Sequence, residues 1–229
     1  MLEALRTEVL KANLELVRRG LVIYTFGNAS GVSREHGLAV IKPSGVPYDR
    51  MTAADMVITD LEGRVVEGGL KPSTDVATHV LLYRAFPSIG GVVHSHSRYA
   101  TAWAQARREI PCFGTTHADY FHGAIPVTGE LTPGEIESDY EANTGVAIIR
   151  RMEGIDPLKC PAVLVAGHGP FCWGASVGDA AHNAVIVEEL AVLAMHTLAI
   201  NPAAVPISDA LRDKHHFRKH GPKATYGQR

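Results

Sequence analysis

Apolar side chains recur at helical spacing in several stretches of the chain, which places them on one face of a helix. The first stretch begins at Leu2 and is closed by Gly20, a residue type that commonly follows a helix. A later stretch ends before Pro87, which cannot continue a helix. On this basis helices are predicted over residues 2–19, 76–86, 98–107, 138–151 and 179–200.

Short apolar runs between these stretches predict strands. A hairpin is predicted where residues 56–59 and 64–67 flank a Leu-Glu-Gly turn. The other predicted strands cover residues 21–26, 38–41, 91–96, 125–127 and 162–166. Residues 27–33 and 42–48 are rich in small residues, glycine or proline, so they are predicted to be loops.

Predicted helices and strands alternate along the chain without an internal repeat or a linker. This order predicts an α/β fold, with a single domain over residues 1–229 and helices covering a sheet. The polar segment after Pro206 is predicted to be partly helical. It is either an ordinary basic terminus or a functional arm, because residues 206–229 contain three histidines and a tyrosine.

Composition removes several classes of function. The chain has 22 Lys and Arg against 24 Asp and Glu, and this balance argues against a nucleic-acid partner, which requires a basic face. The cysteines Cys112, Cys160 and Cys172 are odd in number and lack metal-site spacing, so a reducing cytoplasm fits best. Charges interrupt the N-terminal segment, unlike a signal peptide. The apolar stretch Ala184–Ile200 contains Glu188 and is expected to be too short and too charged for a membrane.

Histidine is the unusual residue, with 12 copies. His94 and His96 follow an apolar run, and residues two apart on a strand point to the same face. His168 follows another apolar run between two glycines. Three histidines with an open position are typical of catalytic zinc, although most His-x-His pairs are ordinary core or surface histidines. Asp75 is either a helix N-cap or a further ligand or base.

Three loops carry groups that could bind a phosphate. The sequences GNASG and KPSG offer backbone N–H groups, the hydroxyls of Ser30 and Ser44 and the charge of Lys42. Ser73 and Thr74 add hydroxyls near a predicted helix N-terminus. Each loop alone is explained by turn chemistry, but the three together favour a phosphorylated substrate.

Asp119 stands between His117 and His122. Such a carboxylate is either a general acid or base or a solvated turn residue, and its spacing alone favours the second. The patterns GxSxG, GxxxxGK[ST] and GxGxxG are missing from the sequence, so hydrolase, P-loop and dinucleotide-binding interpretations lack support.

Taken together, these segments resemble the class II aldolase/epimerase family over nearly the whole chain. The resemblance rests on segments in the family's order: GNAS, KPSG, KPSTD, VVHSHS, THADYF, AGHGPF and DKHHFRKHGPKATYGQ. Each piece is a weak signal, but the ordered set is specific. The resemblance implies a class II aldolase-like α/β fold with a largely antiparallel central sheet covered by helices.

The resemblance also implies a metal and a substrate site. One Zn²⁺ per subunit would be bound by His94, His96 and His168, with Asp75 as an additional ligand. Mn²⁺ or Co²⁺ could replace it, because imidazole and carboxylate ligands accept all three ions. The implied phosphate site has Lys42 nearby and consists of Gly27, Asn28, Ser44, Gly45, Ser73 and Thr74.

Asp119 and Tyr226 would form the acid/base pair, again by resemblance. Tyr226 and His215 would reach the site from a neighbouring subunit of a homotetramer, and residues 206–229 would be the arm that carries them. The aldolases of the family have Glu where this chain has Asp75, and they lack a match to Asp119. Both positions favour an epimerase.

The implied substrate is a pentulose phosphate, and the implied reaction interconverts L-ribulose 5-phosphate and D-xylulose 5-phosphate. Cleavage of C3–C4 by a retro-aldol step, rotation of the aldehyde and re-addition would invert C4. A class II aldolase acting on a related sugar phosphate is the alternative, and a sugar-phosphate binding protein without turnover is another. The resemblance leaves open whether the reaction serves arabinose or ascorbate catabolism.

Overall fold

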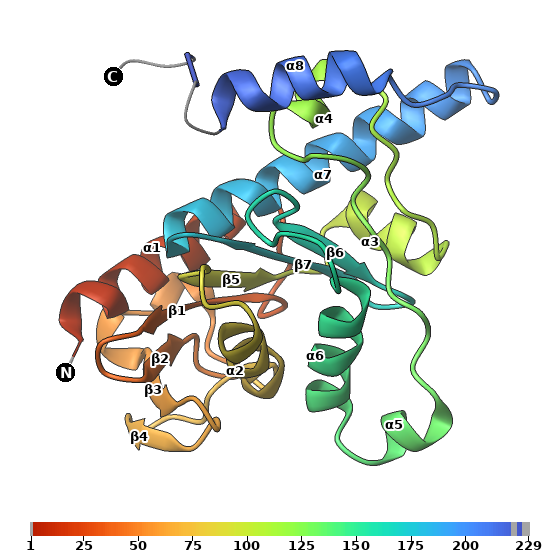
Figure 1. Ribbon diagram of the computed structural model, residues 1–229. Helices are drawn as coiled ribbons and strands as arrows, with labels where there is room; N and C mark the ends of the chain where they lie inside the picture. Colours follow the sequence, from red (N-terminus) through yellow and green to blue (C-terminus); the bar gives the residue numbers. More distant parts are fainter. Residues whose placement is uncertain (1, 221–223, 226–229) are drawn as a thin grey trace.

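Seven strands form one sheet in the computed structural model, which describes residues 2–220 and 224–225 (Figure 1). The strands follow the order β4-β3-β2-β1-β5-β7-β6, and neighbouring strands are antiparallel. Their bounds are β1 Asn28–Ser33, β2 Leu38–Ile41, β3 Val57–Asp60, β4 Val65–Glu67, β5 Gly91–His94, β6 Ala162–Val165 and β7 Gly169–Gly174. The prediction of an α/β fold with a largely antiparallel central sheet is therefore confirmed.

Helices cover both faces of this sheet (Figure 1). Helices α1 and α7 pack against β1, β5 and β7 on one face, while α2 packs against α6 beyond the other. The α-helices are α1 Glu3–Arg18, α2 Val76–Ala85, α3 Arg98–Gln105, α4 Thr115–Ala118, α5 Pro133–Glu137, α6 Tyr140–Arg151, α7 Val177–Ile200 and α8 Asp209–Lys219. Two short 3₁₀ helices lie at Tyr48–Arg50 and Ala53–Asp55.

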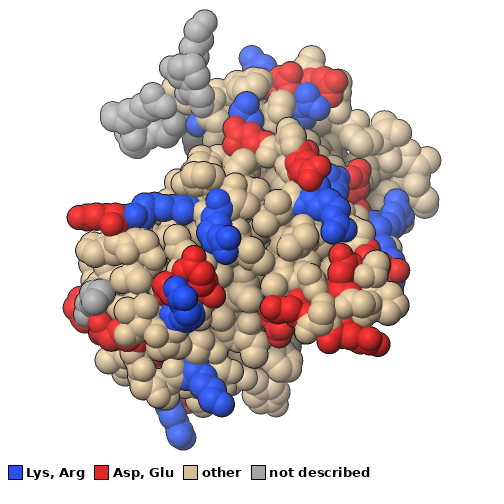
Figure 2. Space-filling view, turned by 60° about the horizontal axis from the view of Figure 1, so that its bottom comes forward, with Lys and Arg blue, Asp and Glu red and all other residues tan. Residues whose placement is uncertain are grey.

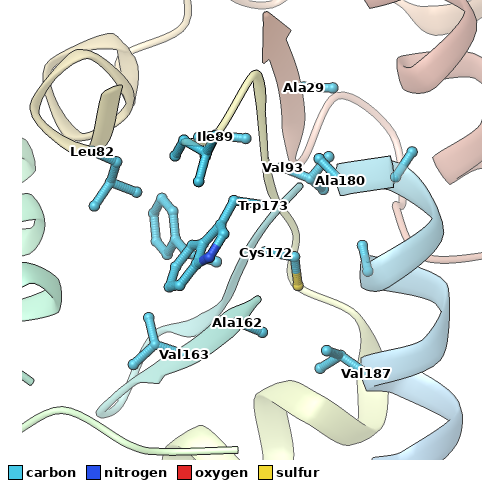
Figure 3. Close-up of a cluster of buried hydrophobic side chains, with 14 of the residues drawn as sticks. Ala29, Leu82, Ile89, Val93, Ala162, Val163, Cys172, Trp173, Ala180 and Val187 are labelled. Carbon is cyan, nitrogen blue, oxygen red and sulfur yellow. The ribbon is translucent and has the colours of Figure 1, made fainter. Parts of the chain in front are cut away.

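The core extends on both sides of β7, as Figure 3 shows. Cys172 points towards Val187 of α7, and the next residue, Trp173, points the opposite way towards Leu82 and Ile89. The Trp173 indole N–H donates to the Pro157 carbonyl at 2.7 Å, so its polar atom is satisfied within the core. Strands β5, β6 and β7 are buried throughout, which explains why their sequences are not alternating apolar and polar.

Helix α7 differs from the sequence expectation. It extends from Val177 to Ile200 and is, by length and composition alone, long and apolar enough to cross a membrane, so the expectation that this stretch is too short is wrong. It packs against β5, β7, α1 and α3. The carboxylate of Glu188 accepts hydrogen bonds from the backbone N–H groups of Tyr99 and Ala100 at 2.8 and 2.9 Å. One face of α7 is therefore buried against the sheet and the neighbouring helices.

The first strand was predicted in the wrong place. Residues 21–26 contain no strand, and the chain turns there through left-handed conformations at Gly20 and Tyr24. The predicted loop 27–33 is instead mostly strand β1. A Cβ at Gly31 would lie 2.5 Å from the Val177 side chain and 2.7 Å from Leu5. Gly31, one of the small residues that suggested a loop, thus lets α1 and α7 approach the strand.

Two further strand predictions need correction. Residues 125–127 contribute only isolated bridges, Ile110 with Ile125 and Val127 with Leu164. Strand β7 was not predicted, because its sequence GPFCWG begins with glycine and proline and resembles a turn. The hairpin prediction is confirmed by β3 and β4.

Candidate metal centre

Three histidines converge at one end of the sheet. His94 is the last residue of β5, His96 lies two residues further on, and His168 lies in the turn between β6 and β7. Their candidate ligand atoms all lie within 4.8 Å of one another. The Nε2 atoms of His94 and His96 are 3.0 Å apart. Two nitrogens bound to one tetrahedral zinc at 2.0–2.1 Å lie about 3.3 Å apart, so this spacing is close to what zinc needs.

The hydrogen bonds of His94 define which nitrogen can bind a metal. Its Nδ1–H donates to the Pro170 carbonyl at 3.0 Å, which leaves a lone pair on Nε2. The ring stacks on Phe171 with a centroid separation of 4.1 Å. His94 is therefore fixed in orientation and tautomer with Nε2 directed at the other imidazoles, and the donor set fits a metal ion.

The surroundings favour neutral imidazoles. Burial lowers the pKa of His94 far below its ordinary value, with further lowering by His168 and His96. Burial also lowers the pKa of His96 and of His168, and the Asp75 carboxylate opposes both shifts. Metal ligation requires the neutral imidazole, so this electrostatic environment suits a metal site.

Asp75 is not a helix cap. It occupies the residue before α2 but makes no side-chain capping bond. Its Oδ2 instead accepts a hydrogen bond of 2.6 Å from the Asn28 side-chain amide, which also donates to Ser73 at 3.0 Å. Asp75 and Thr74 line the same cavity as the three histidines. The sequence alternative of a carboxylate beside the histidines is the one that the geometry favours.

The three predicted phosphate loops lie side by side. Backbone hydrogen bonds join Ser44 N–H to the Lys71 carbonyl and Ser73 N–H to the Lys42 carbonyl, both at 2.9 Å. The Asn28 side chain connects the first loop to the third through Ser73. The hydroxyl-bearing Ser44 and Thr74 are exposed, as is Gly45, which has φ +69°.

Lys42 lies beneath these loops. Its side chain is only 2% exposed, its ammonium donates to the carbonyls of Thr25 and Pro43 at 3.4 and 3.3 Å, and it lies 4.8 Å from the Tyr48 ring centre. Burial lowers the pKa of Lys42. The Tyr48 hydroxyl donates to the carbonyls of Phe26 and Gly27, so this buried pair supports the first loop from below.

A cavity of about 270 Å³ opens at the histidines. Sequence reasoning missed three residues that line it together with the predicted ones: Phe26, Tyr140 and Glu141. Tyr140 and Glu141 come from the first turn of α6, and no motif spacing links that helix to the histidines. A larger hollow of about 740 Å³ between α1 and α7 contains none of the predicted site residues in the described chain.

Asp119 lies in a different part of the molecule. It directly follows α4 and is 8% exposed. Helix α8 packs against α4, and both helices lie on the opposite side of α7 from α2 and α6 (Figure 1). Its carboxylate accepts hydrogen bonds from Arg218 at 2.9 and 3.2 Å and contacts His215 Nδ1 at 3.1 Å. Among the described residues, neither Asp119 nor His215 lines the histidine cavity. Tyr226 lies outside the described residues.

The Asp119 carboxylate is held ionised. Burial alone would raise its pKa, but hydrogen bonds from Arg218 and His215 and the charge of Lys219 outweigh burial, so the pKa is lowered.

Across the face shown in Figure 2, basic and acidic side chains are interspersed. A broad basic field does not dominate that face, so recognition of an anion would depend on local groups such as the three loops.

The antiparallel sheet and the histidine cluster agree with a comparison against known families. Residues 7–195 match the model of the Class II Aldolase and Adducin N-terminal domain. This protein belongs to the class II aldolase family.

Individual relatives narrow this assignment. The chain is 54% identical over 228 residues to L-ribulose-5-phosphate 4-epimerase UlaF of Salmonella paratyphi C, and 53% identical to the same enzyme of Salmonella typhi, with both chains fully covered. Among solved structures, an L-fuculose 1-phosphate aldolase superposes with TM-score 0.77 at 29% identity, covering 93% of this chain and 94% of that chain. The L-fuculose 1-phosphate aldolase of Glaciozyma antarctica, at TM-score 0.76 and 17% identity over 97% of this chain and 84% of that chain, supports the fold alone.

Proposed function

We propose that this protein is a zinc-dependent epimerase that interconverts L-ribulose 5-phosphate and D-xylulose 5-phosphate. The observation that carries the proposal is the 54% identity over the full length to a 4-epimerase. The converging imidazoles of His94, His96 and His168 support a metal-dependent reaction.

The metal would be held by those three histidines, with Asp75 as the additional ligand. Asp75 fits this role because its side chain lies in the histidine cavity and is not used to cap α2. Three nitrogen ligands with an open position are the pattern of a catalytic zinc, and Mn²⁺ or Co²⁺ are possible substitutes. When bound, the ion would supply Lewis acidity to the oxygens of the substrate.

The reaction needs a carbon–carbon bond to break. C4 of a pentulose phosphate carries no acidic proton, so deprotonation at C4 cannot invert it. Retro-aldol cleavage of C3–C4 gives glycolaldehyde phosphate and the enolate of dihydroxyacetone. The aldehyde then rotates, and C3 of the enolate attacks its other face and re-forms the C3–C4 bond. The three loops, with Lys42 beneath them, would hold the phosphate so that the fragment rotates without escaping. The phosphate-binding residues would be Gly27, Asn28, Ser44, Gly45, Ser73 and Thr74.

Asp119 and Tyr226 would exchange the C4 hydroxyl proton on opposite faces of the aldehyde. The contacts that lower the pKa of Asp119 keep it in the carboxylate form, which is the form that would accept the proton before returning it. Because Asp119 and His215 contact each other on a cluster apart from the histidine cavity, we infer that both reach the metal centre of a neighbouring subunit. A homotetramer in which residues 206–229 form the arm at each interface would place them there.

The surface beside the cavity supports such an assembly. Ile23, Tyr24 and Phe26 are exposed apolar residues in one turn, and Phe26 lines the histidine cavity. An exposed apolar cluster at the edge of an incomplete site is typical of a subunit interface. We place the enzyme in the cytoplasm, where the three buried free thiols would stay reduced.

The decisive experiment is a coupled assay that measures D-xylulose 5-phosphate formed from L-ribulose 5-phosphate. Zinc-loaded protein is expected to turn over the substrate, chelator-treated protein is expected to be inactive, and added Zn²⁺ is expected to restore the rate. An L-ribulose 5-phosphate sample left unchanged by zinc-loaded protein would reject the proposal.

An aldolase is the second candidate, because an L-fuculose 1-phosphate aldolase shares 29% identity and TM-score 0.77 with this chain. An aldolase would release free aldehyde from a sugar phosphate, whereas an epimerase keeps the aldehyde bound until re-addition. Trapping free aldehyde during turnover separates the two activities, and stoichiometric release would favour the aldolase.

A further inference from the structure

Tyr140 is the one described side chain whose hydroxyl contacts a histidine of the metal centre. Its hydroxyl oxygen lies 3.1 Å from Nδ1 of His168. The two ring centres are 5.9 Å apart and the rings are tilted by 33°, so the contact is made edge-on through the polar atoms and not by stacking. Both residues line the same cavity.

The backbone around Tyr140 is fixed before any ligand binds. Tyr140 is the first residue of α6, and the Asp139 side chain caps this turn by accepting from Ala142 N–H at 3.3 Å. The Thr144 hydroxyl donates to the Tyr140 carbonyl at 2.8 Å. Because α6 also packs against α2, which begins directly after Asp75, the hydroxyl is presented from a rigid element.

His168 needs such a partner more than His94 does. His94 ends a strand and has its Nδ1–H bound to the Pro170 carbonyl. His168 instead lies in a turn after Gly167, which has φ +71°, and its backbone is held there by the bond from its N–H to the Val165 carbonyl. Nothing in that turn determines which ring nitrogen carries the proton.

We propose that Tyr140 is a positioning residue that accepts a hydrogen bond from His168 Nδ1–H and so directs the His168 Nε2 lone pair at the metal. This inference rests on the proposed metal site. In this arrangement His94 and His168 are oriented by the same device, a proton on Nδ1 bound to an oxygen, supplied by the backbone in one case and by a tyrosine in the other.

The test is the variant Tyr140→Phe, which removes only the hydroxyl oxygen. Zinc affinity is measured by competition with a chromophoric chelator, and the variant is expected to bind zinc about 10–100-fold more weakly than the wild type. The imidazole nitrogens of metal-free protein are followed by ¹⁵N NMR, and the Nδ1–H form of His168 is expected to lose population in the variant.

Tyr83→Phe is the matched control. Its hydroxyl is buried and hydrogen-bonded to Ser30 at 2.7 Å, so its removal should lower stability without changing zinc affinity. Zinc affinity of Tyr140→Phe within about twofold of the wild type, or an unchanged His168 tautomer, would overturn the role of Tyr140. Failure of the wild type itself to bind zinc would instead contradict the proposed metal site.

Discussion

Gly169 determines how closely the strands behind the histidines approach each other. A Cβ at this position would lie 2.7 Å from the Ser95 carbonyl oxygen and 3.6 Å from Cε1 of His94. Gly169→Ala must therefore push β7 away from β5, and overpacking of this kind costs about 1–3 kcal/mol. We expect lower stability in urea denaturation together with weaker zinc binding, because His168 precedes the displaced residue.

Gly178→Ala is the control for this substitution. The closest atom to its added Cβ would be the Ser176 hydroxyl oxygen at 3.8 Å, within the first turn of α7. Replacing glycine by alanine in a helix is expected to be neutral or stabilising by about 0.5–1 kcal/mol. Equal effects of the two substitutions would show that the close approach at Gly169 is unimportant.

At the scale of single residues, the sequence predicted the three histidines of the site but not the tyrosine that contacts one of them. His94 and His96 could be paired from their spacing of two, although the predicted strand 91–96 ends at His94 and His96 lies beyond it. His168 could be added because it follows an apolar run between glycines. Tyr140 could not be predicted. Its contact with His168 depends on how α6 packs beside the sheet, and sequence spacing carries no information about that packing.

At the scale of elements, Glu188 connects α7 to α3, the helix that follows His94 and His96. Its carboxylate accepts from the first N–H groups of α3, at Tyr99 and Ala100, and so acts as a cap supplied from another helix. Glu188→Ala is expected to destabilise the fold by about 1–2 kcal/mol in urea denaturation. Glu189→Ala, an exposed neighbour on α7, should change stability by less than about 0.5 kcal/mol.

The contact between α4 and α8 should depend on pH through Asp119. Because the folded-state pKa of Asp119 is lowered, its ionised form stabilises the fold above the unfolded pKa, and this contribution is lost as pH falls through the folded pKa. The stability difference between the wild type and Asp119→Asn is therefore expected to shrink as pH falls from about pH 5 to about pH 2. A constant difference over this range would contradict the ionic anchoring of α8.

The elements show where local rules of prediction stop. The long helices and the β3–β4 hairpin could be predicted because their patterns are local. Strand β1 could not, since its Gly31 is required by helices α1 and α7, which contact the strand from distant parts of the sequence. Strand β7 begins with glycine for a similar reason, the close approach of Gly169 to the Ser95 backbone just after β5.

At the scale of the whole molecule, mixing two inactive variants can test whether the proposed metal ligands and the proposed acid/base group of one site come from different subunits. His96→Asn removes a proposed metal ligand and Asp119→Asn removes the proposed acid/base group, so each variant alone should be inactive. If every site combines the histidines of one subunit with Asp119 of another, randomly mixed tetramers should regain about one quarter of wild-type activity. A site is then active only when the subunit that supplies the histidines is the Asp119→Asn variant and the subunit that supplies Asp119 is the His96→Asn variant.

Coexpression of the two variants followed by the coupled assay measures this recovery. The double variant His96→Asn with Asp119→Asn, coexpressed with Asp119→Asn, is the control and should stay inactive, since no chain in that mixture carries Asp119. Absence of recovery from the first mixture would place both groups in the same subunit.

The order of the strands has a consequence for folding of the chain during its synthesis on the ribosome. Strand β5 lies between β1 and β7, and β7 follows all of the histidines of the metal centre along the chain. An emerging chain can pair β1 with β5 early, but the turn that holds His168 acquires its shape only when β6 and β7 pair. Folding proceeds from the N-terminus during synthesis, so the metal cannot act as a template for the early steps. Binding of the proposed metal therefore belongs to the last stage of folding, after most of the sheet has been translated.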